Sequence, residues 1–153
     1  MSAELTIRPA KVEDAEPLFR LAVESKAFWD YDEAQMAIFR KELNFSGEQL
    51  VDLSGHVAEL KGKLVGYFTL VVHSNELVEL EHLFVDPALL RQGIGQQLLM
   101  HAIEFSRARG HRLMKIISDP HAAGFYEKAG AEKVDDHESS IPGRTIPVLE
   151  IRL

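Results

Sequence analysis

Residues 83–99 read LFVDPALLRQGIGQQLL. An apolar, strand-like run stops at Asp86-Pro87, a short loop follows, and a helical pattern opens directly after Gly93-Ile94-Gly95. Because glycine has no Cβ, a ligand can approach this backbone closely, and the start of the helix presents unpaired N–H groups and the positive end of a dipole. Such a site suits a phosphate or pyrophosphate. The stretch therefore predicts that the chain binds a phosphorylated small molecule.

Alternating and helical patterns on both sides of this stretch predict one mixed sheet with helices packed on it. The expected strands cover residues 5–8, 56–60, 64–72, 77–85, 113–117, 131–134 and 146–153. The expected helices cover residues 13–24, 33–43, 96–109 and 120–128. Since the 153 residues contain no repeat or Gly/Ser linker, we expect a single domain over 1–153. The fold class is α/β, in α+β layers, with about seven strands flanked by four helices.

Composition limits the classes of partner. The 24 acidic and 17 basic side chains give a net charge of −7, and no basic cluster indicates a nucleic-acid-binding face. No apolar run is long enough to span a membrane, and residues 1–6 lack the apolar core of a signal peptide. We therefore expect a cytoplasmic protein with neither a nucleic-acid nor a membrane partner.

Cysteine and histidine usage limits the chemistry. The chain has no cysteine, which excludes disulfides, thiolate nucleophiles and cysteine-ligated metals. Its seven histidines show neither His-x-x-x-His nor His-Glu-x-x-His spacing, so no metal site is expected. His82 and His121 are expected to be packing or surface residues rather than bases.

A second motif follows one helix and one strand after the glycine loop. Residues 122–130 read AAGFYEKAG, with a glycine at the end of the expected short helix. The two motifs, at this spacing, resemble the GNAT family of acetyl-CoA-dependent N-acetyltransferases of the bacterial type, and the order of elements matches that fold over essentially the whole chain. The resemblance implies a splayed mixed sheet, with acetyl-CoA between the strand that ends at Val85 and the strand that ends near Ile117.

The resemblance also implies how acetyl-CoA is held. Its pyrophosphate would lie on the backbone amides of Arg91, Gln92, Gly93, Ile94, Gly95 and Gln96. Its pantetheine would pair like an added strand with the backbone of Leu83, Phe84 and Val85. Two positions depart from the family pattern: Leu90 stands where arginine or glutamine is usual, and Asp119 where asparagine is usual. Arg91 is the expected source of charge instead, and any contact from Asp119 must differ, because an ionised carboxylate cannot donate a hydrogen bond.

Three residues are candidates for proton transfer. The resemblance places Tyr126 where the family protonates the departing coenzyme A thiolate, although the short helix alone would make it a half-buried aromatic with a wet hydroxyl. Phe125 beside it is expected in the core. Glu79 and Glu81 share one face of their strand, either as a strand end in solvent or as a base for the acceptor ammonium. The family has acids at either position, so the choice between the two stays open.

The acceptor site is expected at two segments. Trp29 and Tyr31 lie in an aromatic and acidic segment that resembles the family's acceptor-binding loop, with core packing as the alternative for Trp29. Residues 139–147 resemble a tail of bacterial members, either a turn into an edge strand or a hairpin over the acceptor site in which Arg144 holds a carboxylate or phosphate. The predicted function is acetyl transfer to a primary amine of a small molecule or peptide by direct attack, since no cysteine exists to carry the acyl group. A homodimer is left open.

Two other functions compete with this prediction. A Rossmann-type, nucleotide-dependent oxidoreductase also has Gly-x-Gly at a helix start, but Leu98 stands at its third glycine position and the loop before Gly93 is long. A non-catalytic acyl-CoA-binding regulatory module would leave Glu79 and Glu81 in solvent and Tyr126 without a path to sulfur.

Overall fold

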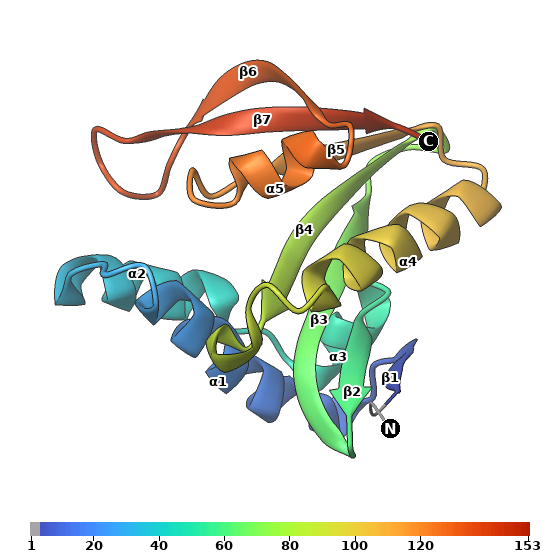
Figure 1. Ribbon diagram of the computed structural model, residues 1–153. Coiled ribbons are helices and arrows are strands. Elements are labelled where there is room, and N and C mark those ends of the chain that lie inside the picture. The colour runs from blue at the N-terminus through green and yellow to red at the C-terminus, as the bar shows by residue number, and fades with distance from the viewer. Residues whose placement is uncertain (1–3) are drawn as a thin grey trace. The chain divides into compact units, whose positions relative to one another are not determined.

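The computed structural model describes residues 4–153. Residues 1–3 belong to the expected domain and to the stretch 1–6 that is expected not to be a signal peptide, and they lie outside the described residues. Its strands and helices follow the order shown in Figure 1. The strands are β1 (Leu5–Pro9), β2 (His56–Leu60), β3 (Lys63–Val72), β4 (Leu77–Val85), β5 (Leu113–Ile117), β6 (Glu132–Glu138) and β7 (Thr145–Arg152). The α-helices are α1 (Ala15–Ala27), α2 (Glu33–Leu43), α3 (Gly47–Asp52), α4 (Ile94–Ala108) and α5 (Ala123–Lys128).

The seven strands form one mixed sheet in the order β1-β2-β3-β4-β5-β7-β6, which confirms the predicted fold class. The described chain divides into two compact units. The first contains the described residues up to Leu70 together with His82–Ala102, and the second contains Val71–Glu81 together with Ile103–Leu153. The single domain expected over 1–153 stays a prediction.

In the first unit, strand β3 packs against different elements on its two faces. A Cβ at Gly66 would lie 2.8 Å from the Leu98 side chain of α4, and the Phe68 ring on the same face lies near His101 of that helix. Tyr67, which lies between Gly66 and Phe68, points to the opposite face, where its ring meets Phe45 between α2 and α3. This alternation follows from the period of two along a strand, and Figure 1 shows α4 and α3 on opposite sides of β3.

In the second unit, β5 is the central strand. It pairs in parallel with β4, from Leu77 opposite Leu113 to Glu79 opposite Lys115, and antiparallel with β7. Strand β7 then pairs with β6, every residue of which is exposed. The buried core side chains of these two strands are Met114 and Ile116 of β5 and Val148, Leu149 and Ile151 of β7.

The structure corrects the predicted helices in four places. Helix α1 covers Ala15–Ala27 rather than residues 13–24. A fifth α-helix, α3, was not expected, although Ser46 and Gln49 form a capping box at its start. Helix α4 begins at Ile94 rather than residue 96. Helix α5 begins at Ala123 rather than at Pro120, because Pro120 lies in a turn that the Ala122 N–H closes on the Asp119 carbonyl at 2.9 Å. Within residues 4–153, none of the helices is long and apolar enough to cross a membrane.

Candidate functional site

The glycine loop has the backbone geometry of an anion-binding turn. Arg91 and Gly93 are both left-handed, with φ of 66° and 83°, and α4 begins at the next residue. Alternating left-handed residues before a helix turn successive N–H groups toward one side, which favours an anion. A Cβ at Gly93 would have no atom within 4 Å, so the space beside the backbone is open. Left-handed arginine is costly, so its presence here points to a functional constraint.

The end of β4 is held close to β3. A Cβ at Gly66 would lie 2.9 Å from the Phe84 carbonyl oxygen, so this glycine permits the approach of the two strands. The Asp86 N–H donates to the Val65 carbonyl at 2.8 Å, and the Asp86 carboxylate caps the following turn by accepting from the Ala88 N–H. Leu83 and Phe84 are half-buried, whereas Val85 is buried. Sequence reasoning missed Gly66, whose signal was an isolated glycine inside a strand.

His82 belongs to a packed aromatic group rather than to a site for proton transfer. Its ring contacts Phe45 and Phe84, and its Nδ1 lies 3.1 Å from the Tyr67 hydroxyl. Burial, and then the positive charge of Lys26, lower the pKa of His82 from 6.5 to about 4. The imidazole is therefore neutral near pH 7, as expected for a packing residue.

The predicted acceptor segment contains two exposed aromatic residues, Phe28 and Trp29, and one half-buried aromatic residue, Tyr31. Trp29 is 41% exposed and meets Phe28 edge to face at 4.9 Å between ring centroids, so core packing of Trp29 is wrong. Tyr31 is half-buried against Phe39, with 4.7 Å between ring centroids. The Lys26 ammonium lies 4.3 Å from the Phe39 centroid, which is cation–π geometry.

Tyr126 is buried, and Phe125 beside it is only half-buried, which reverses the burial expected for Phe125. The orientation of α5 on its sheet decides which of two neighbouring side chains points inward, and no local pattern could distinguish them. Burial, and then the negative charge of Asp119, raise the pKa of Tyr126 well above its ordinary value. The phenol therefore keeps its proton throughout the neutral range.

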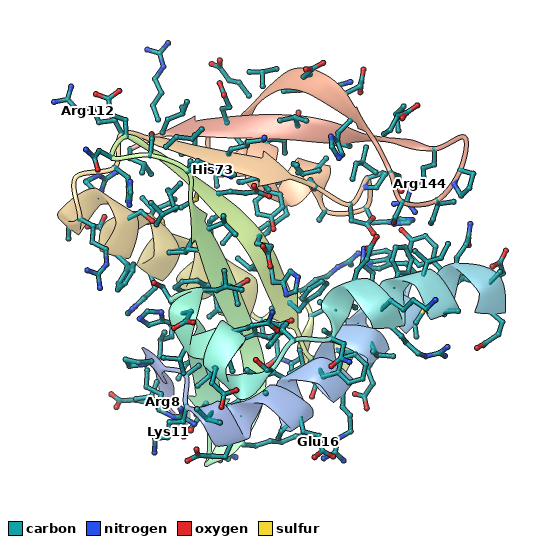
Figure 2. All side chains as sticks on the ribbon, turned by 180° about the vertical axis from the view of Figure 1, so that it is seen from behind. Arg8, Lys11, Glu16, His73, Arg112 and Arg144 are labelled. Atoms are coloured by element: carbon teal, nitrogen blue, oxygen red, sulfur yellow. The ribbon has the colours of Figure 1, made fainter. Side chains whose placement is uncertain are left out.

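The two strand carboxylates have different environments. Glu79 Oε1 lies 2.7 Å from His73 Nε2, and Glu79 stands opposite Lys115 of β5. His73 projects from the end of β3 (Figure 2). Glu81 is an exposed residue, but partial burial of its carboxylate, and then the charge of Glu79, raise the pKa of Glu81. Glu79 thus contacts the His73 imidazole, while the raised pKa of Glu81 suits a general base.

Asp119 joins the loop before α5 to the loop between β6 and β7. Its Oδ1 accepts from the His121 N–H at 2.9 Å and lies 2.7 Å from His121 Nδ1. Its Oδ2 lies 3.7 Å from Arg144 Nη2, and Figure 2 shows Arg144 at the β6–β7 loop. Sequence reasoning treated Asp119 only as a cofactor contact and His121 only as a packing or surface residue.

The structure therefore brings together Asp119, His121 and Arg144, with Tyr126 in reach of the Asp119 charge. These residues belong to the second unit, as do Glu79 and Glu81. The glycine loop, Leu83–Val85, Trp29 and Tyr31 belong to the first. Among residues 4–153, no group of three or more His, Asp or Glu side chains is arranged to hold a metal.

Comparison with known proteins gives a consistent match. Residues 15–131 match the acetyltransferase (GNAT) family. An uncharacterized N-acetyltransferase from Methanocaldococcus jannaschii is 31% identical over an alignment of 86 residues. The match covers 50% of this chain but only 38% of that protein's length. The chain thus spans well under half of this curated relative.

Solved structures show the same fold at low identity. The PaiA N-acetyltransferase from Thermoplasma acidophilum, in complex with coenzyme A, has a TM-score of 0.81 and 22% identity, covering 98% of this chain and 99% of that one. The ribosomal-protein-S18-alanine N-acetyltransferase from Escherichia coli has a TM-score of 0.73 and 18% identity, covering 97% of this chain and 94% of that one.

Proposed function

Because the chain belongs to the GNAT family of acetyltransferases, we propose that it transfers the acetyl group of acetyl-CoA to a primary amine of a small molecule or peptide. The observation that carries the proposal is the open loop before α4, where Arg91 and Gly93 are left-handed and nothing fills the space beside Gly93. A pyrophosphate fits this loop, because backbone amides and a helix start are its preferred partners in proteins.

In this proposal the cofactor is held mainly by backbone. The amides of residues 91–96 bind the pyrophosphate, with the exposed Arg91 as a source of positive charge. Residues 83–85 pair with the pantetheine, and an amide of that strand polarises the thioester carbonyl. Acetyl-CoA supplies an activated acetyl group, because its thiolate is a good leaving group.

Two side chains move protons in the proposed reaction. Glu81 takes a proton from the acceptor ammonium, directly or through water, and the free amine attacks the thioester carbonyl. The C–S bond breaks as the C–N bond forms, and Tyr126 gives its proton to the departing sulfur. The second proton lost from the nitrogen restores the Tyr126 phenol. The products are the N-acetylated amine, coenzyme A and one proton. The chain contains no cysteine, so direct attack needs no thiol carrier.

Contacts are proposed for the apolar part of the acceptor and for its anionic group. Trp29 and Tyr31 pack against the apolar part of the acceptor, and Arg144 binds a carboxylate or phosphate where the acceptor carries one. The negative charge of −7 favours a cationic amine over a neutral one. Cytoplasmic location and a homodimer stay predictions.

The test combines a binding assay and a turnover assay. We expect acetyl-CoA and coenzyme A, but not NADH, to raise the melting temperature of the protein. We expect thiol release from acetyl-CoA in the presence of at least one amine from a panel of amino acids, peptides, polyamines and aminoglycosides. Stabilisation by NADH alone would support the oxidoreductase, and acetyl-CoA binding without thiol release would support the regulatory module.

A further inference from the structure

Asp119 departs from the family pattern at the position where the second motif begins, and its carboxylate joins two segments of the second unit. One oxygen contacts His121 twice, at 2.9 Å from the backbone nitrogen and 2.7 Å from Nδ1. The other lies 3.7 Å from the Arg144 guanidinium. The His121 contacts belong to the turn that leads into α5, and the Arg144 contact belongs to the loop between β6 and β7.

These contacts require a carboxylate rather than an amide. An ionised aspartate offers acceptors on both oxygens, whereas asparagine would offer one oxygen and one NH₂ group that repels a guanidinium. The Asp119 and Arg144 side chains are 15% and 20% exposed, so solvent and salt screen their attraction less than at an open surface.

The loop that carries Arg144 is compact enough to be fixed through this one side chain. The Ser139 N–H donates to the Arg144 carbonyl at 2.8 Å, and the Arg144 N–H donates to the Ile141 carbonyl at 3.2 Å. The Ile141 N–H donates to Ser139 Oγ at 3.1 Å, and Ile141 is buried. A contact that fixes the Arg144 side chain therefore also fixes the position of residues 139–144.

We propose that Asp119 is a positioning residue, which fixes Arg144 and the 139–144 loop beside the segment leading into Tyr126 so that the guanidinium receives an anionic group of the acceptor. This inference rests on the proposed function and narrows its substrate class to amines that also carry a carboxylate or phosphate. This position of Asp119 agrees with the effect of its charge, which contributes to the raised pKa of the buried Tyr126 hydroxyl.

The first test does not depend on activity. Amide hydrogen exchange of Ser139 and Arg144 is measured in wild type, Asp119→Asn, Arg144→Gln and the double variant, with Arg152→Gln as the control. Arg152 is an exposed arginine at the far end of β7, the strand that begins directly after Arg144, and it stands opposite Leu113. We expect exchange about 3-fold faster in either single variant, on the scale of one lost ion pair near the surface. The double variant should be no faster, and the control should match wild type.

Unchanged exchange in Asp119→Asn would overturn the positioning role, as would additive effects in the double variant. The β5 amides report whether each variant is folded, and Arg144→Gln tests the same contact if Asp119→Asn does not fold.

The second test measures specificity with phosphoethanolamine and ethanolamine, and with glutamate and its diamide, as matched amines. We expect Asp119→Asn and Arg144→Gln to raise KM for the amine that carries the anionic group by up to about 10-fold, on the scale of one lost charged hydrogen bond between the guanidinium and that group. KM for the matched amine without an anionic group should not change. Asp119→Glu should restore part of the loss. Acetylation in wild type of only those amines that lack a carboxylate or phosphate would overturn the proposed anionic acceptor. Failure with every amine would contradict the proposed function, while the exchange test would still decide the role of Asp119.

Discussion

Replacing Gly93 by alanine should separate backbone strain from loss of the phosphate site, because the chain contains a matched control. Gly93 and Gly62 have φ of 83° and 76°, and a Cβ at either position would meet no atom within 4 Å. A left-handed alanine costs about 1–2 kcal/mol, and the stiffer unfolded chain offsets about half of that. Both variants should therefore lose about 1 kcal/mol of stability and about 2–4 °C in Tm.

Only Gly93→Ala should also lose affinity for acetyl-CoA, because its methyl group enters the space assigned to the pyrophosphate. Loss of one charge-assisted hydrogen bond is worth about 1.5–3 kcal/mol, so Kd should rise by about 10-fold or more. Isothermal titration calorimetry at 25 °C measures Kd, and thermal unfolding measures the shared destabilisation. Equal acetyl-CoA affinity in Gly93→Ala, Gly62→Ala and wild type would refute the assignment of this loop.

Three further predictions concern titratable groups. Tyr126→Phe keeps the ring and should lower kcat by about 10²–10⁴ with little change in acetyl-CoA affinity, and a normal kcat would make Tyr126 a packing residue. Glu79→Gln removes a negative charge that raises the pKa of Glu81, so the acid limb of the pH profile of kcat/KM should move to lower pH, and no movement would exclude Glu81 as the base. The pKa of His82 falls from 6.5 to about 4 on folding, so the unfolded chain binds more protons in this window. The free energy of unfolding should therefore rise between pH 4 and pH 6.5. Denaturant titration should find a smaller rise in His82→Gln.

The fold could be predicted where local patterns are strong. The bounds of β2, β4, β5 and α2 agree with those expected, because each is an unbroken periodic run between turn residues. Helix α3 was missed because it is six residues long, and its capping box between Ser46 and Gln49 was the available signal.

The sequence supplies candidate residues for the site, whose roles stay predictions, but it does not supply their arrangement. The left-handed Arg91 could not be foreseen, since only glycine adopts that conformation without strain. The contact of Asp119 with Arg144 joins positions 25 residues apart and depends on how β7 pairs beside β5. Likewise, His73 reaches Glu79 only because the chain reverses between β3 and β4.

The most direct test of the central claim follows the acetyl group itself. The protein is incubated with acetyl-CoA that carries a trideuterated acetyl group and with the amine panel, and the products are identified by mass spectrometry. We predict an N-acetylated amine that retains all three deuterium atoms, formed in equal amount to free coenzyme A, and strongly reduced in Tyr126→Phe. Coenzyme A released together with labelled acetate alone, or acetyl-CoA bound without any labelled amide, would contradict acetyl transfer to an amine.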